Sequence, residues 1–154
     1  MYTFVLPLVV LANGLAAGVL VGTLLGGVPL LYSLPAGGYV RAHAFFASRF
    51  DPFMPVCLVF TVLGDAVLTG FGPGGPARAL FALAAVCALG TVIISLVKNV
   101  PINRWIRQLD ADNLPPDFAE RDPRYLWGMW NKVRSLLAVT AFLANVLALP
   151  VLLR

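Results

Sequence analysis

Two side chains in this sequence are suited to exchanging a proton with a bound molecule. The single histidine is His43, and imidazole is the side chain whose unperturbed pKa lies nearest neutrality. Asp65 stands within an apolar run, where a carboxylate is costly and by default marks a functional site. Asp65 could accept a proton or pair with a cation such as Arg134. The alternatives are a solvated loop histidine and a protonated or paired aspartate that only fixes packing.

A polar stripe lies along the last apolar segment of the chain. Trp127, Asn131 and Arg134 are spaced i, i+4 and i+7, which places them on one face of a helix. Asn145 follows Arg134 by eleven residues, which is about 20° off the same line. This alignment favours an inward-facing Arg134 over one that extends to the membrane surface. Asn13 and Asn145 are more typical of hydrogen bonds between helices than of ligand contacts.

A proline flanked by two asparagines follows the third apolar run, in the segment Asn99-Val100-Pro101-Ile102-Asn103. Pro101 lacks a backbone donor and biases Val100 away from helical geometry, so a helix should kink or stop here. Asn99 and Asn103 then either cap the freed carbonyls or point as amides into a cytoplasm-facing cavity.

The elements that position these residues must lie in lipid. The chain of 154 residues is 60% hydrophobic and 12% charged, against about 25% charged in soluble proteins. The net charge of +4 comes from basic residues interleaved with acids, which indicates membrane topology and no nucleic-acid partner. Cys57 and Cys87 lie in apolar runs, and one histidine does not make a multi-histidine metal or haem site. We therefore predict no metal centre.

Four apolar runs have the length of about 20 residues that a membrane span requires. We predict one all-α domain over residues 1–154, an integral membrane four-helix bundle with a first helix too long to be a signal peptide. The predicted helices cover residues 3–31, 52–71, 77–97 and 129–153. The connections are 32–51, a tight turn at 72–76 and a long charged loop at 98–128.

The basic residues predict the orientation of the bundle. Four spans place both termini on one side, together with Arg78 and Arg154, while the other nine of the 11 basic residues fall on the opposite side. The positive-inside rule then puts loops 32–51 and 98–128 in the cytoplasm and the termini outside. Trp105, Trp127 and Trp130 lie where an aromatic belt would mark the membrane edge.

The first apolar run carries a glycine at every fourth position, which forms one stripe along a helix. Without side chains, the stripe lets a neighbouring backbone approach closely. We favour a helix-packing role over a ligand groove, either within the bundle or between copies of the chain. The residues are Gly14, Gly18, Gly22 and Gly26.

Two motifs resemble those of a specific family. They are the Asn99–Asn103 segment after the third span and Trp127-x-x-Trp130-Asn131-x-x-Arg134 before the fourth. The chain resembles the small four-span membrane proteins, long catalogued as a domain of unknown function, that include the anthrone oxygenases. The resemblance covers nearly the whole chain and implies an oxygenase that converts an activated phenolic or anthrone-like carbon into a carbonyl with O₂, without flavin or haem.

The resemblance also implies roles for the residues above. An acidic C–H beside a carbonyl and aromatic rings gives an electron-rich enolate that can reduce O₂, so the protein supplies a base, an oxyanion partner and a dry pocket. His43 or Asp65 would be the base, and Arg134 would stabilise the oxyanion. The remaining residues would bind a hydrophobic aromatic substrate, the amides by hydrogen bonds and the indoles by stacking: Asn99, Asn103, Trp105, Trp127, Trp130, Asn131 and Asn145.

Two other functions fit the same sequence. In one, the protein is a non-catalytic membrane protein, in which the glycine stripe builds a homo-oligomer and the polar residues only fix packing. A small transporter is a weaker alternative, because the four spans show no inverted repeat and no pair of broken helices.

Overall fold

The computed structural model describes residues 2–50, 53–72 and 74–152, and these residues form helices and turns without a strand. The elements are α1 (Tyr2–Gly22), η1 (Thr23–Gly27), α2 (Val28–Ser33), α3 (Ala36–Phe50), α4 (Phe53–Phe71), α5 (Pro76–Ile94), η2 (Ser95–Asn99), α6 (Val100–Ile106), α7 (Phe118–Arg121) and α8 (Arg124–Leu152). Both η elements are single π-helical turns. The predicted all-α class is confirmed.

Four described helical segments are long and apolar enough to cross a membrane. They are Tyr2–Ser33, Phe53–Phe71, Pro76–Ile106 and Phe118–Leu152. Large apolar side chains such as Phe4, Phe71 and Leu25 are exposed on their outer faces, which lipid but not water accommodates. The protein is therefore a multi-pass membrane protein with a helical bundle.

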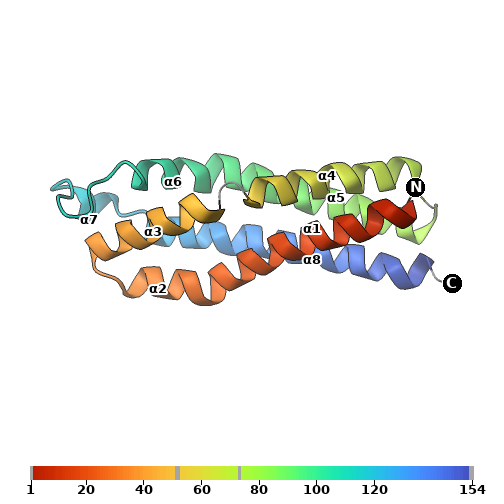
Figure 1. The fold of residues 1–154 in the computed structure, drawn as a ribbon, viewed down its shortest axis with the longest axis horizontal. Helices are drawn as coiled ribbons and strands as arrows, with labels where there is room; N and C mark the ends of the chain where they lie inside the picture. The colour runs from red at the N-terminus through yellow and green to blue at the C-terminus, as the bar shows by residue number, and fades with distance from the viewer. Residues whose placement is uncertain (1, 51–52, 73, 153–154) are drawn as a thin grey trace.

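The bundle is a closed ring in which α1 packs on α4 and α8, and α5 packs on the other sides of α4 and α8. Figure 1 shows both termini and the turn between α4 and α5 at one end, with α2, α3, α6 and α7 at the other. The two termini and the α4–α5 turn, which are predicted to share a side of the membrane, thus do lie at the same end of the bundle. Which end faces the cytoplasm stays a prediction.

The segment predicted as the connection 32–51 is largely a helix. Helix α3 begins after Pro35, whose carbonyl accepts the Tyr39 amide at 2.8 Å. Its buried residues Tyr39, Val40, His43 and Ala47 form one face, while the opposite face carries charge. The prediction of a connection here was wrong: Pro35 and the glycines favour a turn, but the apolar residues that follow recur with the helical period of 3.6 and form the buried face of α3.

The long loop is also shorter than the predicted 98–128. The third helix continues to Ile106, because the π turn η2 ends at Asn99 and Pro101 enters the first turn of α6, where a missing donor costs little. Helix α8 begins at Arg124, directly after Pro123. The boundaries predicted at residues 97 and 129 were therefore wrong.

Small residues allow close packing at several helix crossings. A Cβ on Gly64 would lie 2.3 Å from Val9 Cγ2, so α4 needs this glycine to approach α1. In the glycine stripe, only Gly14 packs within the bundle, where its Cβ position is 3.0 Å from the Phe142 ring of α8. The other stripe positions, Gly18, Gly22 and Gly26, are exposed, and a Cβ on any of them would meet no described atom within 4 Å. The stripe is therefore not a packing surface inside this bundle along most of its length.

Candidate functional site

We call the end of the bundle that carries α2, α3, α6 and α7 the loop end. A largely apolar cavity of about 180 Å³ lies inside this end. The elements that contribute to it are α1 with η1, α2, α3, α4, α5 with η2, α6 and α8, and its walls include Val19, Leu31, Phe46, Phe50 and Leu58. A few polar residues converge on the same space: Thr23, His43, Ser95, Asn103, Trp127 and Arg134. An apolar cavity with few convergent polar groups is the usual form of a small-molecule site.

His43 contacts the side-chain amide oxygen of Asn103 at the cavity. Its Nε2 lies 3.0 Å from Asn103 Oδ1, which also accepts the Trp127 Nε1–H at 2.9 Å. Since this oxygen is an acceptor, the arrangement places the imidazole proton on Nε2 and the lone pair on Nδ1. The His43 side chain is 1% exposed. The alternative of a solvated loop histidine is therefore wrong, because α3 turns this residue into the bundle.

Aromatic rings enclose the imidazole on two sides. The Trp127 ring centroid lies 4.7 Å from that of His43, and Tyr39 presents its ring at 5.3 Å in an edge-on arrangement. Burial and the nearby Asp122 carboxylate raise the pKa of the Tyr39 phenol well above its usual range. Tyr39 therefore stays neutral beside His43 and acts through its ring.

Arg134 faces the cavity rather than the membrane surface. Its Nε and Nη2 donate to Asn131 Oδ1 at 3.1 and 2.8 Å, and its Nη1 donates to Ser95 Oγ at 3.2 Å. The guanidinium carbon also lies 5.9 Å from the centroid of the Trp127 ring. Asn131 is fully buried and acts as an anchor for the cation, so it does not itself line the cavity.

Asn99 joins η2 to α8 behind the cavity. Its Nδ2 donates to the Trp127 carbonyl at 3.2 Å, and its side chain makes no cap on α6. The two asparagines that flank Pro101 therefore both point into the bundle. Asn103 lines the cavity, whereas Asn99 lies outside the cavity lining and binds the backbone of Trp127. The alternative in which Asn99 caps a freed helix end is wrong.

Asp65 and Asn145 do not belong to this cavity. Asn145 Nδ2 donates to Asp65 Oδ2 at 3.1 Å, and both side chains are fully buried in the span between α4 and α8. The partner that the structure gives Asp65 is thus Asn145. The polar stripe on α8 is interrupted by buried Ala138 and Ala141 between Arg134 and Asn145. Asp65 is consequently not placed to act on a molecule bound beside His43.

Two of the three tryptophans also lie outside the cavity. Trp105 stacks on Phe118 with ring centroids 5.9 Å apart, and Arg121 lies over its face. Trp130 lies beneath Lys98, with the ammonium 5.1 Å from the ring centroid. Both are half-buried, as expected for rings at a membrane edge. Only Trp127 is placed where it could stack on a bound molecule.

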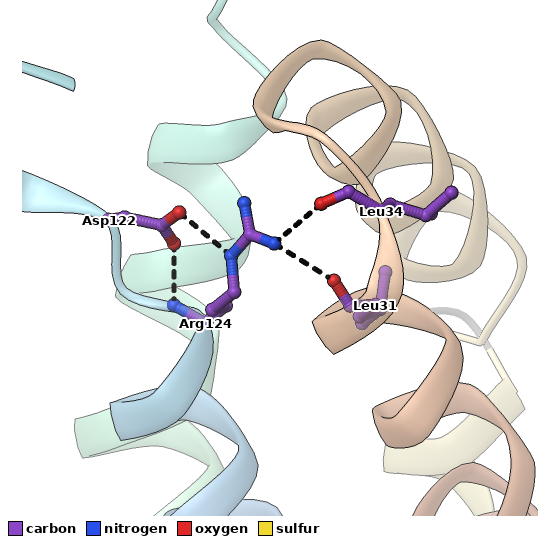
Figure 2. Close-up of polar contacts among 4 residues, drawn as sticks. All are labelled: Leu31, Leu34, Asp122 and Arg124. Atoms are coloured by element: carbon purple, nitrogen blue, oxygen red, sulfur yellow. Dashed lines mark hydrogen bonds and ion pairs between the residues drawn. The ribbon is translucent and has the colours of Figure 1, made fainter. Parts of the chain in front are cut away.

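The sequence interpretation missed Ser95, Tyr39 and Arg124. Ser95 precedes Asn99 by four residues, so helical spacing could have found it. Arg124 had no such signal, because it was predicted to lie within a loop. Figure 2 shows its guanidinium between the Asp122 carboxylate and the carbonyls of Leu31 and Leu34.

The site thus combines a buried imidazole and a cation around an apolar space, with Ser95 as an acceptor that orients the cation. Such a set can deprotonate a bound molecule and stabilise the oxyanion that results. Among residues 2–50, 53–72 and 74–152, no group of three or more His, Cys, Asp or Glu side chains could hold a metal ion.

Comparison with known proteins gave one match. Neither the curated proteins nor the solved structures contain a significantly similar chain. The model of the anthrone oxygenase family matches residues 42–144, from α3 through most of α8, and so includes His43, both asparagines around Pro101, and Arg134. Because this match covers more than half of the chain, the protein belongs to the anthrone oxygenase family.

Proposed function

We propose that this protein is an O₂-dependent oxygenase that acts on an activated aromatic small molecule of the anthrone or phenol class. The observation that carries the proposal is that His43 and Arg134, from two different helices, line the same largely apolar cavity. Membership of the family supports the same class of chemistry. The apolar walls suit a polycyclic substrate that partitions into lipid.

The chemistry requires a base and an oxyanion partner. His43 Nδ1 takes a proton from the acidic CH₂ that lies beside the carbonyl and the aromatic rings, which leaves an electron-rich enolate. The Arg134 guanidinium stabilises the enolate oxygen. Ser95 Oγ accepts a hydrogen bond from Arg134 Nη1 at 3.2 Å and donates its own proton to the Thr91 carbonyl at 2.7 Å, so it orients the guanidinium. The enolate carbon reduces O₂ and forms a hydroperoxide, which loses water to give the ketone. One CH₂ and one O₂ thus become one C=O and one H₂O, and no further reductant is needed.

The orientation of the protein is part of the proposal. The loop end carries nine of the 11 basic residues, so the positive-inside rule places the cavity near the cytoplasmic surface and the termini outside. Labelling of single cysteines placed at residues 48 and 74, in a background without Cys57 and Cys87, tests this. The proposal requires that only position 74 react with an impermeant maleimide added to intact cells.

The activity is tested with purified protein in lipid nanodiscs. Anthrone and simpler phenols are added, and O₂ uptake and the quinone or ketone product are measured together, with metal analysis of the same sample. The expected result is substrate-dependent O₂ uptake with one carbonyl formed per O₂. Uptake that is unchanged in His43→Ala would contradict the assigned base, and a stoichiometric metal would contradict the cofactor-free form of the reaction.

A second candidate function rests on the exposed part of the glycine stripe. Gly18, Gly22 and Gly26 leave open space on the outer face of α1 and η1, which a helix of a second copy could approach closely. In this alternative the protein is a non-catalytic homo-oligomer. It predicts that Gly22→Leu lowers the oligomeric state measured by mass photometry in nanodiscs, while no substrate produces O₂ uptake.

A further inference from the structure

Arg124, at the first turn of α8, connects three elements around the site. Its Nη1 donates to the carbonyls of Leu31 and Leu34 at 3.2 and 2.8 Å, at the end of α2. Its Nε donates to Asp122 Oδ2 at 2.7 Å, and both side chains of this pair are largely buried. Figure 2 shows this arrangement, in which the guanidinium bridges the start of α8 and the α2–α3 turn.

These contacts hold the α2–α3 turn against α8. The carbonyls at the end of a helix lack intrahelical donors, so a guanidinium that donates to two of them stabilises the turn. The approach is close: a Cβ on Gly128, one turn beyond Arg124, would lie 2.1 Å from the Tyr32 hydroxyl. Leu31, whose carbonyl Arg124 binds, also lines the cavity.

The same guanidinium contacts α3 through Tyr39. The Arg124 guanidinium carbon lies 4.4 Å from the centroid of the Tyr39 ring, which is a cation–π contact in a buried setting. Tyr39 is fully buried and turns its ring edge-on to His43 at 5.3 Å. A continuous path of contacts therefore leads from Arg124 to the imidazole.

Arg124 also belongs to the helix that carries Trp127, the second ring against His43. Helix α8 thus supplies one neighbour of the imidazole directly and fixes the other through Arg124. Displacement of α3 relative to α8 would break the shared acceptor geometry at Asn103, which depends on distances of 2.9 and 3.0 Å.

We propose that Arg124 is a positioning residue for His43: through the α2 carbonyls and the Tyr39 ring it sets where α3 lies relative to α8, and so keeps the imidazole on Asn103. Arg124 does not line the cavity and touches no bound molecule. The consequence for turnover depends on the proposed oxygenase function, whereas the consequence for the imidazole does not.

The first experiment follows His43 without any turnover. The chain has one histidine, so ¹⁵N- and ¹³C-labelled histidine in tag-free protein gives a single imidazole to observe by NMR in nanodiscs. The native protein should show one set of resonances with the proton on Nε2. Arg124→Gln should give shifted or doubled resonances from a mixture of tautomers, and Arg124→Lys should lie between the two.

The matched control is Arg121→Gln. Arg121 lies three residues earlier, pairs with Asp117 at 3.1 Å and is exposed, so its loss should leave the His43 resonances unchanged. Unchanged resonances in Arg124→Gln would overturn the inference, and so would equal changes in both variants. If Arg124→Gln does not fold, Asp122→Asn removes the carboxylate that orients Arg124, and native His43 resonances in that variant would likewise overturn it.

The second experiment measures turnover of anthrone. A misplacement of the base by about 1 Å lowers a rate on the order of 10- to 100-fold. We expect this loss in kcat for Arg124→Gln, with KM changed by about twofold or less, because the cavity walls remain. Altered resonances in a protein whose native form shows no turnover would retain the inference and reject the oxygenase. Altered resonances with native kcat would reject the functional part of the inference.

Discussion

Two of the buried polar clusters in the described part of the chain differ in position and in how their groups are paired. The cavity cluster comprises two hydrogen-bonded groups with bonds of 2.8–3.2 Å, one of His43, Asn103 and Trp127 and one of Ser95, Asn131 and Arg134. The guanidinium carbon of Arg134 lies 5.9 Å from the centroid of the Trp127 ring and so brings the two groups together. The mid-span cluster comprises Asp65 and Asn145, joined by one hydrogen bond of 3.1 Å, with buried Asn13 also facing the bundle interior.

The mid-span cluster leaves several polar atoms without a partner. Among the described residues, both amide atoms of Asn13, Asp65 Oδ1 and Asn145 Oδ1 have no hydrogen bond, and in the cavity cluster Asn131 Nδ2 has none either. An ionised carboxylate with one amide donor in the middle of a bilayer is costly. The two clusters differ in position as well: His43 and Arg134 line the cavity, whereas Asp65 and Asn145 do not. On that difference we assign the proposed chemistry to the cavity cluster.

The largest effect should come from loss of the imidazole. His43→Ala removes the proposed base, and general base catalysis contributes about 10²- to 10⁴-fold. We expect a loss of this size in kcat for anthrone oxidation, measured by O₂ uptake. The helical content and the monodispersity of the variant should match those of the native protein, and residual activity within tenfold of native would contradict the assignment.

Loss of the cation should have the next largest effect. Arg134→Ala removes the proposed donor to the enolate oxygen, and removal of one such donor typically costs about 10²- to 10³-fold in kcat. Lys132→Ala is the matched control, because Lys132 lies on the exposed face of the same helix turn. Equal losses in both variants would indicate a general effect of charge on the loop end, which contradicts a specific role for Arg134.

Substitutions at Asp65 test the mid-span cluster. Asp65→Asn keeps the shape and the acceptor, so turnover per folded protein should stay within about twofold of native. Asp65→Leu removes the acceptor of Asn145 and should lower the free energy of unfolding in mixed micelles by on the order of 1 kcal/mol. A tenfold loss of kcat in Asp65→Asn would show that the mid-span cluster takes part in the reaction.

The smallest effect is expected at the Tyr39 hydroxyl. Its oxygen has no hydrogen-bond partner among the described residues, and the contacts to Arg124 and His43 involve the ring. Tyr39→Phe should therefore change kcat by less than about twofold and unfolding by less than about 0.5 kcal/mol. Tyr39→Leu removes the ring contacts, so a variant that behaves like Tyr39→Phe would remove this ring from the positioning path.

Much of the cavity site was predictable because helical spacing is local. The spacing of Trp127, Asn131 and Arg134 placed them on one inward face, and Pro101 drew attention to Asn99 and Asn103. The same reasoning put Trp105 and Trp130 beside a substrate, but these rings instead contact Phe118 and Lys98 at the membrane edge. A ring at the correct depth in the membrane can face the cavity or turn away from it, because the sequence does not fix the rotation of its helix about the helix axis.

The amino-acid sequence by itself determined the solvent and the spans. Hydropathy summed over about 20 residues is large enough to identify a membrane helix whatever the rest of the chain does. The resemblance to the anthrone oxygenase family rested on short motifs, and the match of the family model confirms the family.

Only the tertiary structure decided which polar groups meet. The bond between His43 and Asn103 joins residues 60 positions apart, Asn145 reaches Asp65 over 80, and Arg124 reaches Leu31 over 93. Each contact depends on the register and rotation of one helix against another, which are set by packing at residues such as Gly64 and Gly128. For that reason Asp65, the most conspicuous polar residue in the sequence, lies apart from the cavity, whereas Arg124 binds the carbonyl of Leu31, which lines the cavity.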